Sequence, residues 1–207
     1  MATKSWYWWG LAAVVLVAAF TLCPAAAQLS AFHAQYWSQG SFSFLVAEDS
    51  DNFGRSVAAG DFDNDGFADL AIGSPGEDVT AGPGIEIDNA GVVTILYGAA
   101  NGLAVADAQL FRQGGAGLAG TAEAGDNWGF SLATGDFDGD GFDDLAVGAP
   151  VHDNGTFPDM GEVQVIYGSA SGLTATGSQT WTDFYFSDFA GLLIGWSLAA
   201  GDFDGDA

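Results

Sequence analysis

Two short segments of the chain carry aspartates at one shared spacing. They are GDFDNDGFADLAIGSP (residues 60–75) and GDFDGDGFDDLAVGAP (residues 135–150). If the first aspartate is position 1, carboxylates occupy positions 1, 3, 5 and 9, and a glycine occupies position 6. The aspartates are Asp61, Asp63, Asp65 and Asp69 in the first copy and Asp136, Asp138, Asp140 and Asp144 in the second. This pattern predicts a loop that wraps around a hard cation.

Calcium fits this spacing best. Ca²⁺ binds six to eight oxygens at about 2.3 to 2.6 Å, and a short loop supplies them by turning alternate side chains inward. The glycine permits a sharp turn, after which the main-chain carbonyl of Phe67 or Phe142 points at the ion. Without a cation, two carboxylates about 4 Å apart repel by about 4 kcal/mol at an effective dielectric of about 20. An exposed acidic turn is the alternative, but two copies with identical spacing favour metal.

A third copy of the motif begins near the end of the sequence. GDFDGDA at residues 201–207 supplies three further aspartates, and positions 7 to 9 do not follow. We therefore expect the third site to be incomplete in this chain. Its ligands would be Asp202, Asp204 and Asp206.

The residues around each loop predict strands rather than helices. An EF-hand needs a Glu at position 12 and a helix on either side, whereas position 12 is Ile72 or Val147 here. Short apolar runs at residues 56–59 and 70–73 end in glycine or a Gly-x-Pro turn, which is typical of strands. Each loop is thus predicted to join two strands of one sheet.

The repeat extends beyond the loops. Residues 53–60 match residues 128–135 and 194–201 position for position, and GVVTILYG (91–98) matches GEVQVIYG (161–168). The latter pair alternates as half-buried strands do, and weaker strand candidates follow at residues 109–113 and 179–184. Tandem units of about four strands are typical of propeller blades.

The order of these motifs resembles the FG-GAP repeat, which is found in the N-terminal propeller of integrin alpha subunits and in many secreted bacterial proteins. Phe53-Gly54, the aspartate loop and Gly73-Ser74-Pro75 carry the resemblance. It implies an all-β, seven-bladed β-propeller with calcium in some of its loops. Seven blades of about 65 residues need roughly 450 residues, so we expect an incomplete propeller of about two and a half blades.

Domain boundaries follow from these motifs and from the N-terminus. Lys4, an apolar run over residues 6–22 and Ala25-Ala26-Ala27 predict a signal peptide cleaved before Gln28, with an uncleaved anchor as the alternative. The predicted segments are a signal peptide (1–27), a lead-in (28–43), repeat 1 (44–118), repeat 2 (119–187) and the start of repeat 3 (188–207). The protein is therefore expected outside the cell or on its surface.

Charge and the remaining polar residues narrow the function. Against 27 acidic residues there are only 3 basic ones, for a net charge of −24, which disfavours nucleic acid and anionic membranes as partners. His33 and His152 have no spaced partner that suggests a triad or a zinc site, and Ser56, Ser131 and Ser197 recur inside matched strands, so no enzymatic site is predicted. Asn154 fits a glycosylation acceptor.

The resemblance implies calcium-dependent adhesion or binding of an extracellular protein or glycan, without membrane contact after signal cleavage. Two alternatives share the same architecture. One is a carbohydrate-binding lectin, and the other is a targeting module of a larger secreted enzyme. Fold alone does not separate these functions, because function lies in the loops that the blades carry.

Overall fold

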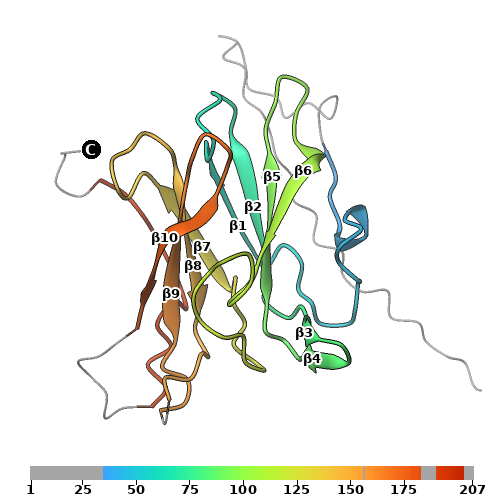
Figure 1. Cartoon of the computed structure of the whole chain (residues 1–207), viewed down its shortest axis with the longest axis vertical. Coiled ribbons are helices and arrows are strands. Elements are labelled where there is room, and N and C mark those ends of the chain that lie inside the picture. Colours follow the sequence, from blue (N-terminus) through green and yellow to red (C-terminus); the bar gives the residue numbers. More distant parts are fainter. Residues whose placement is uncertain (1–34, 156, 183–189, 203–207) are drawn as a thin grey trace, which may run out of the picture.

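The computed structural model describes residues 35–155, 157–182 and 190–202. It is an all-β structure of two four-stranded antiparallel sheets and a two-stranded hairpin (Figure 1). Blade 1 has the strand order β1 (Ser56–Gly60), β2 (Asp69–Ser74), β5 (Val92–Tyr97) and β6 (Ala104–Phe111). Blade 2 consists of β7 (Ser131–Gly135), β8 (Asp144–Ala149), β9 (Glu162–Tyr167) and β10 (Thr174–Trp181) in sequential order. The predicted blades of four strands are confirmed.

Other elements lie at the margins of blade 1. The hairpin of β3 (Val79–Gly82) and β4 (Ile85–Ile87) lies between β2 and β5 in the sequence, and the 3₁₀ helix η2 covers Gln39–Ser41. Among the described residues, no helix is long and apolar enough to cross a membrane. The predicted signal peptide lies outside the described residues.

Strand β2 is buried along its whole length because both of its faces are covered. Leu70 and Ile72 join the hydrophobic core on the lead-in side of blade 1, and Ala71 joins the core between the blades. Alternate residues of a strand point to opposite faces, so the sequence of a strand that is covered on both faces is an almost continuous apolar run. The strand predicted over residues 70–73 therefore lies at the centre of its sheet.

The two blades pack face to face around one shared core. Val93 and Ile95 of blade 1 lie in a cluster with Leu145 and Val147 of blade 2, and all four are fully buried. Trp128 is also fully buried in this cluster, so it packs between the blades. Trp196 is instead 54% exposed and contacts Phe130 at a ring distance of 4.7 Å.

The repeated glycines and serines hold successive repeats together. A Cβ on Gly73 would lie 2.1 Å from the carbonyl oxygen of Gly129, the glycine that opens the next repeat. The hydroxyl of Ser56 donates to that same oxygen at 2.6 Å. Gly148, Ser131 and Gly195 repeat this arrangement one blade further on, with a serine distance of 2.6 Å. The motif therefore marks a backbone contact that no larger residue permits.

The lead-in segment is part of the packed structure. Trp37 and Phe42 pack with Phe53 in the second hydrophobic core. Gln-Tyr-Trp-Ser-Gln-Gly at residues 35–40 matches Gln-Leu-Phe-Arg-Gln-Gly at residues 109–114, the end of β6 and the start of its following loop. The lead-in thus covers blade 1 much as residues 109–118 cover blade 2.

A buried polar cluster lies beneath the lead-in. The side-chain amide of Gln39 donates to Asp51 Oδ2 at 2.7 Å and also to the Glu77 carboxylate. Burial, followed by the nearby Asp51 and Glu48 carboxylates, raises the pKa of Glu77 from 4.5 to about 8. At neutral pH the cluster therefore retains a proton that an exposed glutamate would release.

The prediction of a strand at the start of the third copy is wrong, as far as the described residues show. Residues 197–201 form no strand, although their counterparts are β1 and β7. In both blades this segment pairs with the strand that follows the acidic loop. Ile194 alone forms an isolated bridge, to Gly161.

We expect Gly73→Ala to destabilise the protein by about 1 to 3 kcal/mol, the usual cost of forcing an extra methyl group into a packed site. Gly40→Ala is the matched control, because a Cβ there meets only Ser38 Oγ at 3.8 Å. Urea denaturation of both variants measures the difference. Equal stability of the two variants would contradict the proposed role of the inter-blade glycine.

We expect Glu77 to make the folded protein less stable as the pH rises from about 4.5 to about 8. Over this range the folded protein retains a proton on Glu77 that the unfolded chain has released, and stability falls wherever the folded state binds more protons. Glu77→Gln should remove this part of the pH dependence. Denaturation of wild type and variant at several pH values tests it, and parallel curves would exclude Glu77 as the cause.

Candidate metal centres

The acidic segments connect the first two strands of each blade, as predicted. Gly60 pairs with Asp69 at the end of the β1–β2 ladder, and Gly135 pairs with Asp144 at the end of the β7–β8 ladder. Residues 61–69 are here called loop 1 and residues 136–144 loop 2. Both loops project from the same end of the two sheets, at the upper edge of Figure 1.

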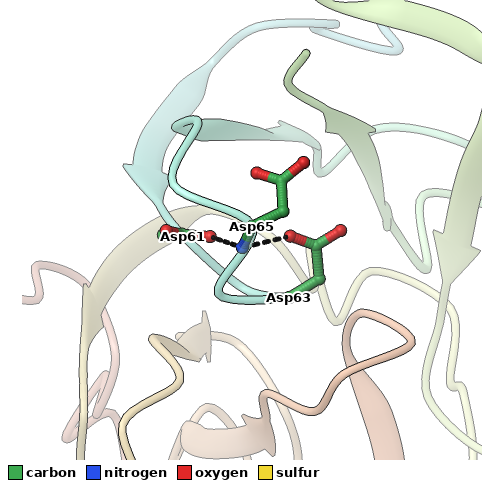
Figure 2. A group of neighbouring side chains, drawn as sticks. All are labelled: Asp61, Asp63 and Asp65. Carbon is green, nitrogen blue, oxygen red and sulfur yellow. Dashed lines mark hydrogen bonds between the residues drawn. The ribbon is translucent and has the colours of Figure 1, made fainter.

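Loop 1 turns three carboxylates toward a common centre. Oxygens of Asp61, Asp63 and Asp65 all lie within 4.8 Å of one another. Figure 2 shows the backbone amide of Asp65 between the other two carboxylates, donating to Asp61 Oδ1 at 3.0 Å and to Asp63 Oδ1 at 3.2 Å. The amide of Gly66, at a φ of +90°, donates to Asp61 Oδ2 at 3.0 Å. The backbone therefore holds the side chains in place.

Loop 2 repeats this hydrogen-bonding pattern. The amide of Asp140 donates to Asp136 Oδ1 at 3.1 Å and to Asp138 Oδ1 at 3.2 Å. The amide of Gly141, at a φ of +92°, donates to Asp136 Oδ2 at 3.0 Å. Oxygens of Asp136, Asp138 and Asp144 lie within 4.8 Å of one another.

The last aspartate of each loop is buried and ties the loop to its sheet. Asp69 accepts the amides of Phe62 and Gly98 at 2.8 and 2.7 Å. Asp144 accepts the equivalent amides, those of Phe137 and Gly168, at 2.7 and 2.8 Å. These carboxylates consequently support the loop whether or not they also bind an ion.

Burial and like charge raise the pKa of several loop carboxylates. Burial raises the pKa of Asp69 to about 6, although the amides of Gly98 and Phe62 lower it. The pKa of Asp144 is raised by burial as well, and that of Asp63 by burial and then by the Asp65 carboxylate. A bound cation would favour the ionised form of each group.

The donor set fits a hard cation, because each loop groups anionic oxygens and offers no sulfur or nitrogen ligand. Calcium would be held by the predicted carboxylates, and its role there would be to neutralise them and fix the loop. Asp69 and Asp140 lie outside the two groups of three. The carbonyl contributions of Phe67 and Phe142 stay predictions, as does the third site, since Asp204 and Asp206 lie outside the described residues.

Sequence reasoning missed two features of this region. Asp143, at position 8 of loop 2, accepts the backbone amide of Asp61 in loop 1 at 2.8 Å. The second feature is a pair of acidic neighbours of His152 that the sequence did not predict. Its Nδ1 lies 3.3 Å from Asp126 Oδ2 and its Nε2 lies 3.6 Å from Glu162 Oε2. Asp126 lies two residues before Trp128, just as Asp51 lies two residues before Phe53. This match between the repeats was the signal in the sequence for a buried polar cluster at Asp126.

The His152 cluster is a second buried polar cluster, in which Gln113 from the segment after β6 meets residues of repeat 2. Gln113 donates to Glu162 at 2.6 Å, as Gln39 donates to Glu77 in the first cluster. The interaction with Asp126 raises the pKa of His152, while burial raises that of Glu162. His152 occupies the position in repeat 2 that Glu77 occupies in repeat 1, and this place in the repeat indicates a structural role.

Comparison with known proteins identifies the two complete repeats. The model of the FG-GAP repeat matches residues 53–96 and 128–166. Over 173 residues the chain is 35% identical to phosphatidylinositol-glycan-specific phospholipase D of Rattus norvegicus, covering 82% of this chain and 19% of the relative. The Homo sapiens enzyme is 32% identical over 169 residues, 80% of this chain and 19% of the relative. Integrin alpha-PS2 of Drosophila melanogaster is 34% identical over 104 residues, 50% of this chain and 6% of the relative.

Fold, loops and motifs together define a repeat protein built from propeller blades. The chain contains two FG-GAP repeats, and over half of its length it is similar to an integrin alpha subunit. It spans about a fifth of the length of the phospholipases that it matches.

We expect Asp69→Ala and Asp63→Ala to differ sharply in metal-free protein. The Asp69 substitution leaves the amides of Phe62 and Gly98 without their acceptor, and a buried unsatisfied group costs about 1 to 3 kcal/mol. Asp63 accepts only the amide of Asp65, so its loss relieves repulsion at little cost. Thermal denaturation in excess chelator compares the two. A larger loss of stability in Asp63→Ala would contradict this division of roles.

Proposed function

We propose that the chain is a calcium-stabilised FG-GAP propeller module that acts outside the cell or on its surface, in adhesion or in binding an extracellular protein or glycan. The observation that carries the proposal is the convergence of three carboxylates in each of two equivalent loops. Clustered carboxylates with their side chains fixed by backbone amides suit a divalent cation. The resemblance to an integrin alpha subunit supports the adhesive role.

Export is part of the proposal. An apolar N-terminal segment followed by small residues supports secretion with cleavage before Gln28. N-terminal sequencing of secreted protein checks this, and a retained Met1 would support the anchor instead.

A second candidate function is a targeting module joined to a larger secreted enzyme. The specific observation in its favour is the alignment with a phospholipase D, of which this chain covers only 19%. Mass spectrometry of the mature secreted protein separates the candidates. A catalytic domain in the same polypeptide supports the targeting role, and a mature protein composed of repeats alone contradicts it.

We expect isothermal titration calorimetry of chelator-treated protein to give a calcium stoichiometry near two, one ion per complete loop. Asp63→Ala should remove one site, because it deletes one of the three clustered oxygens of loop 1. Asp107→Ala is the matched control, since this exposed aspartate lies on β6. Absence of calcium uptake by wild type at millimolar calcium would refute the proposed metal binding.

Adhesion is tested separately. Cells should attach to a surface coated with the protein when calcium is present and detach in chelator. A variant carrying both Asp63→Ala and Asp138→Ala should not support attachment at the same calcium concentration. Attachment that is insensitive to chelator, or no attachment at all, would count against adhesion.

A further inference from the structure

The two candidate calcium loops are hydrogen-bonded to each other through one residue. The amide of Asp61 donates to Asp143 Oδ2 at 2.8 Å, and the amide of Asp143 donates to the carbonyl oxygen of Asp61 at 3.1 Å. The amide of Ser169, also in blade 2, donates to the Phe62 carbonyl at 3.1 Å. Blade 2 therefore fixes the backbone at the point where loop 1 begins.

Asp143 occupies a particular place in loop 2. Its chain neighbours are Phe142 and Asp144, both predicted ligands of the second ion, and its own side chain serves loop 1 instead. The equivalent residue of loop 1 is Ala68, which has no carboxylate. The repeat pattern alone therefore predicts no role for the Asp143 side chain. Its contact with loop 1 indicates one.

Gly60 provides the space for this contact. A Cβ on Gly60 would lie 3.0 Å from Cβ and Oδ2 of Asp143 and 3.0 Å from Cε1 of Phe62. The corresponding position in blade 2, Gly135, has a similar phenylalanine contact, to Phe137 at 3.2 Å, and no carboxylate beside it. Asp143 therefore packs closely against the start of the first loop, and a side chain at position 60 would displace it or Phe62.

We propose that Asp143 is a positioning residue for the calcium site of loop 1 and that it couples the two sites, so that calcium in loop 2 raises the affinity of loop 1. This inference rests on the proposed calcium binding. An ion in loop 2 would fix Phe142 and Asp144, and with them the residue that holds Asp61, the first ligand of loop 1. The first ion to bind removes conformational entropy from this contact, so the second ion has less entropy to remove when it binds. The coupling is reciprocal, so each ion raises the affinity for the other by the same factor.

Coulombic repulsion between the two ions opposes this coupling. Salt screens exposed charges over about 8 Å at physiological ionic strength, whereas it leaves a hydrogen-bonded contact largely intact. The titrations should therefore be run at physiological and at higher ionic strength. Added salt should preserve or increase the favourable coupling.

The experiment resolves the two sites by NMR. The backbone amides of Gly66 and Gly141 lie inside loop 1 and loop 2 respectively, so their signals report each site during a calcium titration. Asp143→Ala should weaken the loop 1 site by about tenfold, within the usual range of coupling effects. Asp143→Asn retains an oxygen acceptor and should restore most of that affinity. Asp107→Ala, which removes the same charge on β6, should change neither signal's midpoint.

A double-mutant cycle tests the coupling itself. Asp138→Ala disables loop 2 and should lower the affinity of loop 1 in the wild-type background. It should have no further effect in the Asp143→Ala background. The first comparison needs no substitution at Asp143, so it holds even if that variant folds poorly.

The outcomes separate this inference from the function on which it rests. If wild type shows two calcium transitions and the Gly66 midpoint is unchanged by Asp143→Ala or by Asp138→Ala, the coupling is refuted and calcium binding stands. If neither glycine signal responds to calcium in wild type, the proposed calcium binding fails, and the coupling fails with it.

Discussion

Mutual repulsion among clustered carboxylates is the constraint on which the rest of this structure depends. Each blade begins with two strands joined by a loop that gathers aspartate oxygens within 4.8 Å. Backbone amides from the loop offset part of the repulsion. Burial first, and then the neighbouring carboxylates, raise the pKa values of Asp63, Asp69 and Asp144. The net charge of −24 adds to the repulsion among the carboxylates. A divalent cation is the simplest means of relieving this charge at short range.

The loops and the blade junction form one mechanical unit. Trp128 and the surrounding core join the two sheets, and the contact of Gly73 with Gly129 fixes how closely they approach. Since Asp143 reaches from one loop to the other, the separation of the blades also sets the geometry of the first candidate site. Metal binding and blade packing are thus expected to stabilise each other.

Much of this arrangement could be predicted from the sequence. The strands around each loop follow from apolar runs closed by glycine, and the ligand positions follow from a spacing that occurs twice. These features are local, so one segment of sequence contains all the information they need. The buried Trp128 was also predictable, because its position recurs in every copy.

The features that were missed arise from contacts between distant segments. Asp143 differs from its counterpart Ala68, and only the neighbouring loop explains the difference. His152 meets Asp126 and Glu162, which lie 26 residues before it and 10 residues after it in the same repeat. The strand expected at residues 197–201 is absent because a strand requires a pairing partner as well as a suitable sequence. Repetition predicts a unit well and predicts the contacts between units poorly.

The melting temperature of the protein in calcium and in excess chelator tests the central claim most directly. At ten times its dissociation constant, calcium would stabilise the fold by about 1.4 kcal/mol per site. A change of 1 kcal/mol shifts the melting temperature of a domain of this size by about 2 to 4 °C. We therefore predict a melting temperature several degrees higher in calcium, with magnesium restoring less because it retains its waters. Identical melting curves in calcium and chelator would show that the loops are ordinary acidic turns.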